Sequence, residues 1–202
     1  MSGVHQSYPT TRLLLVRHGE TEANVAGRMQ GRGNDPLTER GHHQVRAIAA
    51  RLKREAHMID AIYTSSLLRA RLTAEVIGAE LDLIPRPREG LQEFHLGDLE
   101  GASSKELSAA APRTPDERYP GGESPREFVE RIMGTLHGLV AAHSGSAIVA
   151  VSHGGVISTA LSFWARGHGG AWRDYTPNNC ALSIIEFRAG PELVSINDCV
   201  HL

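Results

Sequence analysis

Two segments of the chain consist of apolar residues without a polar interruption, residues 13–16 (LLLV) and residues 147–151 (AIVAV). A strand inside a parallel sheet is covered on both faces, so its sequence lacks the alternation of a half-exposed strand. We therefore predict that both segments are buried strands. The first ends directly at Arg17 and His18, and the second ends at Ser152 and His153.

Apolar residues at helical spacing predict two amphipathic helices with well-marked starts. Thr38 can cap a helix whose apolar positions are Val45, Ile48, Ala49 and Leu52. Ser124 and Glu127 form a capping box around Pro125, which suits the first position of a helix. The apolar stripe of this second helix is Phe128, Ile132, Leu136 and Val140.

The other expected elements are shorter. A strand near residues 60–63 precedes a helix that Ser65 or Ser66 would cap, that Gly78 would end, and whose apolar face is Leu68, Leu72 and Val76. Another helix follows His153 to about residue 165, and strands are expected near residues 181–187 and 193–197.

Strands alternating with helices predict an α/β fold, a three-layer sandwich whose mostly parallel central sheet is flanked by helices. The 202 residues fit one domain, which we expect to span the whole chain. Within it, residues 1–11 are expected to be a flexible tail. Residues 102–123, rich in Ala, Ser and Pro, are expected to form a short helix and a loop on the substrate side of the domain.

The composition excludes several classes of partner. Lys and Arg total 21 against 23 Asp and Glu, so no broad basic face for nucleic acid or an anionic membrane is expected. The N-terminal residues lack the apolar core of a secretory signal, and no apolar run approaches the ~20 residues of a membrane span. We expect a cytoplasmic protein in which Cys180 and Cys199 are reduced core thiols.

The two histidines that follow apolar strands are the first indication of chemistry. Ligands of open α/β sheets bind at the carboxyl ends of the strands. Either His18 or His153 alone could be an ordinary loop residue, but their shared position favours a common site.

A series of motifs then resembles one family. The segment around His18 reads LLLVRHGETEAN, and it is followed in order by residues 27–41 (GRMQGRGNDPLTERG), 64–75 (TSSLLRARLTAE), 91–101 (LQEFHLGDLEG), 121–124 (GGES), 151–155 (VSHGG) and 197–202 (NDCVHL). These motifs resemble the histidine phosphatase superfamily, which includes cofactor-dependent phosphoglycerate mutase.

The resemblance implies a role for each matching residue. His18 would be the nucleophile that becomes phosphohistidine, Arg17 and Arg69 would bind the phosphoryl group, His153 would complete the pocket, and Glu93 would donate the proton. Further candidate substrate contacts are Asn24, Thr21, Gln30, Gly154, Arg113 and Arg118. Thr21 and Ser124 can also serve as caps, and Arg71 is expected to face solvent or a surface ion pair.

These residue types suit phosphoryl transfer on chemical grounds. Guanidinium groups bind phosphate in a bidentate manner and stay charged. Nearby cations also keep a histidine neutral, as a nucleophile must be. Glu20, Glu22 and Glu100 remain competing carboxylates for the acid role. The family often has Trp at the positions of Ala23 and Leu99 and Asp at the position of Asn34. These differences leave the identity of the substrate undetermined, but not the type of reaction.

Other reaction classes find less support. The histidines lack metal-ligand spacing, so we expect neither a metal nor a cofactor. A cysteine phosphatase needs C-x5-R, but Glu186 stands six residues after Cys180. A mutase needs cationic groups to hold the second anionic group of its bisphosphorylated intermediate. The segment of residues 94–121 carries only the scattered cations Lys105, Arg113 and Arg118, so we favour hydrolysis of a small phosphorylated metabolite. A phosphoglycerate mutase and a non-catalytic phosphate-binding relative are the alternatives.

Overall fold

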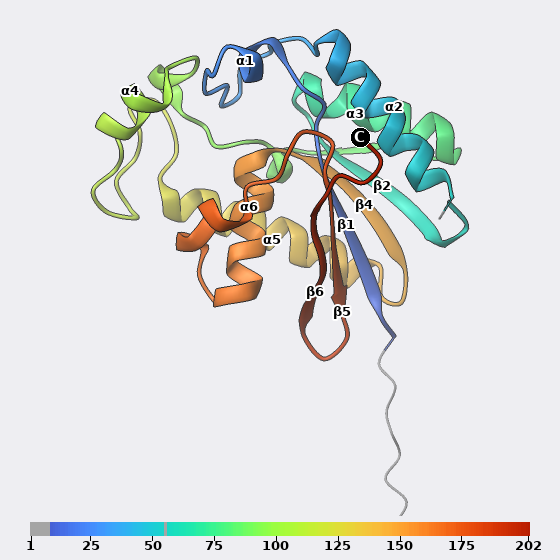
Figure 1. The fold of residues 1–202 in the computed structure, drawn as a ribbon. Helices are drawn as coiled ribbons and strands as arrows, with labels where there is room; N and C mark the ends of the chain where they lie inside the picture. Colours follow the sequence, from blue (N-terminus) through green and yellow to red (C-terminus); the bar gives the residue numbers. More distant parts are fainter. Residues whose placement is uncertain (1–8, 55) are drawn as a thin grey trace, which may run out of the picture.

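The computed structural model describes residues 9–54 and 56–202 and contains a six-stranded sheet of order β3-β2-β4-β1-β5-β6 (Figure 1). The strands are β1 (Thr11–Arg17), β2 (Ile59–Ser65), β3 (Arg86–Arg88), β4 (Ala147–Ser152), β5 (Leu182–Phe187) and β6 (Pro191–Asp198). Strands β1 to β4 pair in parallel, whereas β5 and β6 pair antiparallel. The mostly parallel sheet is as predicted.

Helices cover both faces of the sheet. Helices α2 (Glu39–Lys53) and α3 (Leu68–Leu81) pack on one face, and α5 (Pro125–Ala142) and α6 (Gly154–Arg166) pack on the other. The short helices are α1 (Glu22–Val25), α4 (Ser104–Ala109) and the 3₁₀ segments Ala56–Met58, Glu89–Leu91, Gly97–Leu99 and Gly169–Tyr175. The predicted three-layer α/β sandwich is confirmed.

The two apolar runs form strands that are buried on both faces. In β1, Leu14 and Val16 pack with α2 and α3, while Leu13 and Leu15 pack with α5 and α6. Successive side chains of a strand point to opposite faces, which explains why neither run alternates.

The pairing of β1 with β4 positions both histidines. Arg17 lies opposite Ser152 in this parallel pair, and the N–H of His18 donates to the carbonyl of Ser152 at 3.0 Å. His18 and His153 therefore leave neighbouring strands at the same edge of the sheet.

The predicted caps of α2 and α5 are present. The Thr38 hydroxyl accepts a hydrogen bond from the N–H of Gly41 at 2.9 Å. Ser124 and Glu127 form the reciprocal capping box, with Pro125 as the first helical residue. Both helices begin where their local sequence predicts.

Helix α3 differs from its prediction at both ends. Its N-cap is Leu67 rather than Ser65 or Ser66, because the Ser65 hydroxyl accepts from the N–H of Leu67, one step before the helix. The helix also continues through Gly78 to Leu81, and its C-cap is Asp82, whose φ is +57°. A Cβ on Gly78 would lie 2.4 Å from the carbonyl oxygen of Leu83, so close packing rather than helix termination requires glycine.

The side chains of α3 also distribute differently from the prediction. The predicted stripe of Leu68, Leu72 and Val76 is only partly buried, and the fully buried face carries Ala70, Ala74 and Ile77. Two of these three buried residues are alanines, which lets the helix lie close to the sheet, while Leu68, Leu72 and Val76 border the contact.

Several boundaries need correction. Thr11 already lies in β1 and is buried, so a tail of residues 1–11 extends too far, while residues 1–8 lie outside the described residues. Cys180 is buried as predicted, but Cys199 is partly exposed; both are free thiols. The strand β3, helix α1 and the 3₁₀ segment Gly169–Tyr175 were not expected.

The segment of residues 102–123 contains α4 followed by a loop, as predicted, and Figure 1 shows it extending to one side of the sheet.

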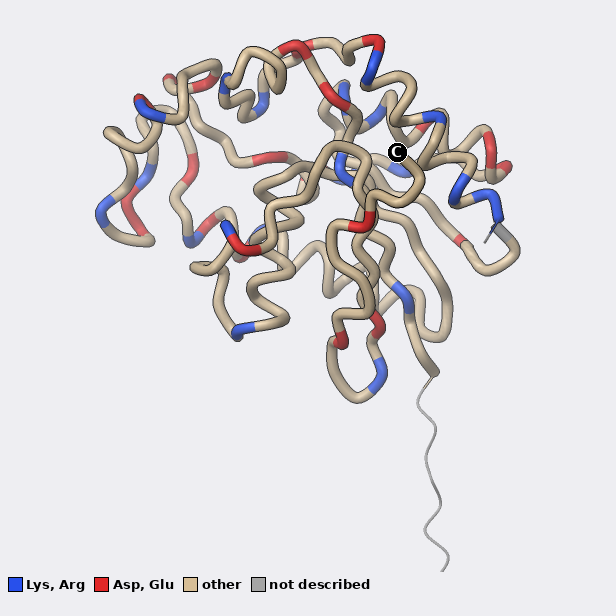
Figure 2. The backbone as a smooth tube through the Cα atoms, in the orientation of Figure 1, with Lys and Arg blue, Asp and Glu red and all other residues tan. Residues whose placement is uncertain are grey.

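Figure 2 shows basic and acidic positions interspersed along the backbone. Across residues 9–54 and 56–202, no helix has the length and apolar character needed to cross a membrane.

Candidate active site

His18 is buried directly after β1, and its hydrogen bonds define its protonation. Its Nδ1 lies 2.8 Å from the carbonyl oxygen of Gly19, which can only accept, so Nδ1 carries the proton. The Nε–H of Arg69 donates to the other ring nitrogen, Nε2, at 3.2 Å. In the neutral ring, Nε2 therefore carries the lone pair that a nucleophile uses.

The surroundings of His18 keep the ring neutral. Burial lowers the pKa of His18 well below its usual 6.5, and the positive charges of Arg69 and Arg17 lower it further. The bond to the Gly19 carbonyl opposes this shift only in part. His18 is thus unprotonated at neutral pH.

Arg69 lies in the first turn of α3 and is almost fully buried. Its Nη1 and Nη2 donate to the carbonyl oxygens of Gly33 and Gly31 at 2.7 and 2.8 Å. A guanidinium has five N–H donors, so with the bond to His18 three are used and two remain. Burial lowers the pKa of Arg69 to about 10, and it stays protonated at neutral pH.

Arg17 supplies the second cation. Its Nη1 donates to the carbonyl oxygen of Pro177 at 2.7 Å, while its Nε is buried and has no hydrogen-bond partner among the described residues. A Cβ built on Gly154 would lie 3.4 Å from this Nε, so the start of α6 packs against Arg17. Gly154 is the first residue of α6, where the helix offers no acceptor for its N–H.

His153 lies beside His18, with 5.2 Å between the ring centroids. Its Nε2 shares a hydrogen bond of 2.7 Å with the Ser65 hydroxyl at the end of β2, and its Nδ1 is buried without a partner in the described chain. Burial lowers the pKa of His153 well below its usual range, and the charge of Arg69 adds to the effect. This second ring is also neutral.

Glu93 lies against the N-terminus of α6. Its two carboxylate oxygens accept from the N–H of Phe94 at 2.9 Å and the N–H of Gly155 at 2.8 Å. A Cβ at Gly155 would come within 2.4 Å of the carboxylate, so only glycine allows this approach. Burial lowers the pKa of Arg17 and of Arg69, and the negative charge of Glu93 opposes this shift in both.

Asn24 is held next to His18 by a residue that the motifs did not indicate. Its side-chain oxygen accepts from the N–H of Thr21 at 3.2 Å and from the Asn179 amide at 3.0 Å. The same Asn179 amide donates to the carbonyl oxygen of His18 at 3.1 Å. The oxygen of Asn24 is thus occupied, which leaves its NH₂ group as the end that can meet an anion.

The remaining candidate contacts divide into two groups. Thr21 caps α1 by accepting from the N–H of Asn24, and Gln30 is buried on the loop that Arg69 binds, with Oε1 unpartnered in the described chain. Arg113 and Arg118 are exposed, and Arg118 pairs with Glu127, so the structure does not bring them to His18.

The competing carboxylates have other partners or are exposed. Glu20 accepts from the Thr38 hydroxyl at 2.9 Å and pairs with Arg40 at 3.4 Å. Glu22 is exposed on α1, and Glu100 accepts from the backbone N–H of Arg32 at 3.0 Å. Glu93 instead accepts from the N–H of Gly155 at the start of α6, next to Gly154, which packs against Arg17.

Sequence reasoning missed the residues that support these groups. Besides Ser65 and Asn179, the Thr73 hydroxyl accepts from the N–H of Gly19 at 3.1 Å. Arg131 donates to the backbone of the segment that carries Glu93. Ser65 and Thr73 lie within a matched motif, but Arg131 and Asn179 lie outside every motif and only the fold brings them close.

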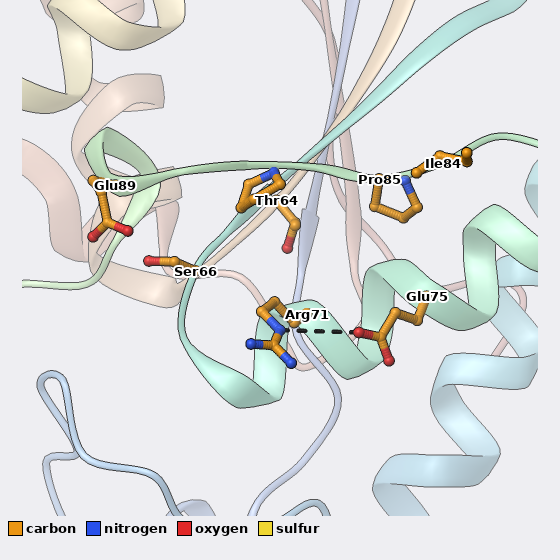
Figure 3. Close-up of a pocket in the computed structure, with 8 residues that line it drawn as sticks. Thr64, Ser66, Arg71, Glu75, Ile84, Pro85 and Glu89 are labelled. Atoms are coloured by element: carbon orange, nitrogen blue, oxygen red, sulfur yellow. Dashed lines mark ion pairs between the residues drawn. The ribbon is translucent and has the colours of Figure 1, made fainter.

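A hollow of about 450 Å³ lies elsewhere, between α3 and β3 (Figure 3). Its lining includes Ser66, Ile84 and Glu89, and Figure 3 shows Arg71 and Glu75 paired at its edge. Arg71 therefore lies in a surface ion pair, as expected, with its Nε 3.9 Å from a carboxylate oxygen of Glu75 one helical turn away.

In the described part of the chain, no group of three or more His, Cys, Asp or Glu residues is arranged to hold a metal ion.

Comparison with known proteins identifies the family. The model of the histidine phosphatase superfamily (branch 1) matches residues 13–199. The chain is 38% identical over 200 residues to a probable phosphoglycerate mutase, GpmB, of Photorhabdus laumondii, covering 91% of this chain and 88% of the relative. It is 39% identical over 158 residues to the metal-independent phosphoserine phosphatase of Arabidopsis thaliana, covering 73% and 66%.

A solved structure agrees with these matches. A phosphoserine phosphatase mutant of Entamoeba histolytica, in complex with phosphoserine, aligns with a TM-score of 0.83 at 30% identity, covering 95% of this chain and 99% of that one. The chain therefore belongs to branch 1 of the histidine phosphatase superfamily, whose matched members are enzymes of phosphatase and mutase type.

Proposed function

We propose that this chain is a metal-independent phosphomonoester hydrolase that acts on small phosphorylated metabolites of the cytoplasm through a phosphohistidine on His18. The observation that carries the proposal is the neutral His18 ring, whose Nε2 lone pair faces the guanidinium of Arg69. A nucleophile, two cations and a carboxylate converge there, which is what phosphoryl transfer requires.

In the first step, Nε2 of His18 attacks phosphorus, the N–P bond forms and the P–O bond to the alcohol breaks. Glu93, protonated at this stage, gives its proton to the leaving alkoxide and becomes a carboxylate. Arg17 and the free donors of Arg69 stabilise the charge on the equatorial phosphoryl oxygens. No step needs a metal or another cofactor.

In the second step, water attacks phosphorus and the N–P bond breaks, which restores the neutral His18. Glu93 takes the proton from the attacking water and returns to its starting form. Its place against the N–H of Gly155 suits this alternation, because helix-end N–H groups stabilise the carboxylate between the steps.

Unpartnered buried atoms support a ligand at this place. Apart from Arg12, which pairs with Glu186, the buried side-chain atoms without a partner in the described chain belong to Arg17, His153, Gln30 and Arg32. Buried polar atoms normally have a partner. We infer that a phosphoryl oxygen binds Arg17 Nε and His153 Nδ1, with the Ser65 hydroxyl donating to His153 Nε2.

Hydrolysis is favoured over mutase activity by the cations of residues 94–121. A mutase must hold a second anionic group of its bisphosphorylated intermediate. Arg118 is instead exposed and paired with Glu127, and Arg113 is also exposed. Phosphoglycerate mutase activity is the second candidate, because the relative from Photorhabdus laumondii carries that name.

The deciding experiment begins with a screen of phosphorylated metabolites for released phosphate. The protein is then incubated with 3-phosphoglycerate, with and without 2,3-bisphosphoglycerate, while free phosphate and 2-phosphoglycerate are followed. We expect phosphate release from screened esters and loss of at least ~10³-fold in His18→Ala, together with loss of an acid-labile phosphoryl label. Bisphosphate-dependent formation of 2-phosphoglycerate with little phosphate released would contradict hydrolysis.

A further inference from the structure

The segment that carries Glu93 has no regular secondary structure of its own to hold it. Residues 92–96 follow the short 3₁₀ helix Glu89–Leu91 and precede the 3₁₀ helix Gly97–Leu99. Backbone carbonyls in such a segment need partners from elsewhere, since buried polar groups are costly when unpaired. The partners that they find determine where the Glu93 carboxylate lies.

Arg131 of α5 supplies partners to three carbonyl oxygens of residues 90–93. Its Nη1 donates to the carbonyl oxygens of Gly90 and Gln92 at 3.1 and 2.9 Å, and its Nη2 donates to that of Glu93 at 3.4 Å. The intervening carbonyl, of Leu91, accepts from the Ser152 hydroxyl at 2.8 Å. One guanidinium therefore fixes three of these four consecutive carbonyls.

Glu123 holds Arg131 in this orientation. The Arg131 Nε and Nη2 donate to its two carboxylate oxygens at 3.1 and 2.6 Å, which is a bidentate pair. One of these oxygens also accepts from the N–H of His95 at 2.8 Å, so Glu123 anchors the other side of Glu93. The two side chains are only 20% and 11% exposed, and Arg131 lies over the Phe128 ring at 5.3 Å.

We propose that the Arg131–Glu123 pair is a positioning device for the Glu93 carboxyl group, which makes Arg131 a residue on which proton transfer to the leaving group depends. The inference rests on the proposed function, because it assumes that Glu93 is the general acid. Arg131 touches neither His18 nor the phosphoryl site in this arrangement; it acts through the backbone of residues 90–93. Only a planar fork reaches all of these acceptors, so lysine cannot replace arginine here.

The test uses leaving-group dependence. An aryl oxide leaves with little help from an acid, whereas an alkoxide needs its proton. We expect Arg131→Lys to lower kcat/KM, which reports the step in which the leaving group departs, by ~10-fold or more for O-phosphoserine and by less than ~3-fold for 4-nitrophenyl phosphate. Lysine keeps the positive charge at this position, so a loss of charge does not explain the difference. Arg126→Lys is the matched control. Arg126 lies on α5 like Arg131, but it is exposed and pairs with Asp116, so its substitution should change neither rate.

A double variant separates positioning from a general structural effect. If Arg131 acts through Glu93, Glu93→Gln combined with Arg131→Lys should be no more than ~2-fold slower than Glu93→Gln alone on O-phosphoserine. Additive losses, or equal slowing of both esters by Arg131→Lys, would overturn the inference. If circular dichroism shows that Arg131→Lys is unfolded, Glu123→Gln provides the same comparison with a milder change.

The single variant Glu93→Gln tests the acid role of Glu93 separately from the positioning role of Arg131 and Glu123. If it lowers kcat/KM equally for both esters, the acid role of Glu93 is wrong and the proposed mechanism needs another carboxyl group, because kcat/KM reports the first step and not the later attack of water. If it slows O-phosphoserine selectively while Arg131→Lys and Glu123→Gln do not, the mechanism stands and the positioning role is wrong.

Discussion

His18 combines burial with two nearby cations, and both act on its protonation in the same direction. Burial disfavours the imidazolium, and Arg69 and Arg17 penalise a second positive charge. Because the pKa is lowered, the ring stays neutral as pH falls through 6.5, the usual His pKa, and protonates only in more acidic solution. In the proposed reaction the same arginines would therefore have two tasks, keeping the His18 nucleophile neutral and binding the phosphoryl group.

We expect Arg69→Met to raise the pKa of His18, because the substitution removes one of the two nearby charges. Burial is the larger cause, so the pKa should move toward the usual range without reaching it. NMR titration of the protein with labelled histidine measures the shift. Arg71→Met is the matched control, since Arg71 lies on the same helix but is exposed and paired with Glu75. A His18 titration unchanged in Arg69→Met would contradict the assigned electrostatic effect.

At the same scale, the matches to family motifs indicated more of the candidate site residues than the spacing of residue types alone could. The resemblance supplied His18, Arg17, Arg69, Glu93 and His153, and the structure brings these side chains together. Asn179 and Arg131 could not be found in this way, because their partners lie far away in sequence. Asn179 contacts His18 and Asn24 only because β5 pairs with β1.

At the scale of whole elements, local signals predicted well and tertiary contacts explain the errors. The capping box of Ser124 and the apolar runs of β1 and β4 depend on neighbouring residues, so the sequence alone indicated them. The end of α3 depends instead on where the chain returns after the helix. Gly78 stays helical because the turn at Leu83 and Pro85 packs directly over it.

This difference between glycines gives a stability prediction. Gly134 lies on the exposed side of α5, where a Cβ would meet nothing within 4 Å. We expect Gly134→Ala to stabilise the protein by about 0.5–1 kcal/mol, because alanine loses less backbone entropy in a helix. Gly78→Ala should destabilise it by about 1–3 kcal/mol, since the new methyl group would meet the Leu83 carbonyl.

Urea unfolding followed by circular dichroism measures both free energies of unfolding. Gly138→Ala is the internal check, because Gly138 lies one helical turn after Gly134 and is equally open. If Gly78→Ala were as stable as Gly134→Ala, close packing would not be the reason for glycine at position 78.

At the scale of the whole molecule, the fold gathers the charges that phosphoryl transfer needs from distant parts of the chain. Arg17 ends β1, Arg69 lies in the first turn of α3, and α6 brings its N-terminus to Glu93. The parallel strands β1, β2 and β4 all end at this edge, which supplies His18, Ser65 and His153. Many phosphatases obtain positive charge from metal ions, and in the reaction proposed for this chain arginine side chains would supply it.

We therefore expect turnover to survive exhaustive chelation. The protein is dialysed against EDTA, and kcat/KM for 4-nitrophenyl phosphate is compared before and after treatment, with Mg²⁺, Mn²⁺ and Zn²⁺ added back singly. The rate should stay within ~2-fold, because no step of the proposed reaction uses a bound ion. Orthovanadate should still inhibit the chelated enzyme, since its five-coordinate form resembles the transition state and would bind His18 and the arginines. Loss of turnover on chelation, with recovery on adding one divalent ion, would contradict the metal-independent mechanism even if His18 remained the nucleophile.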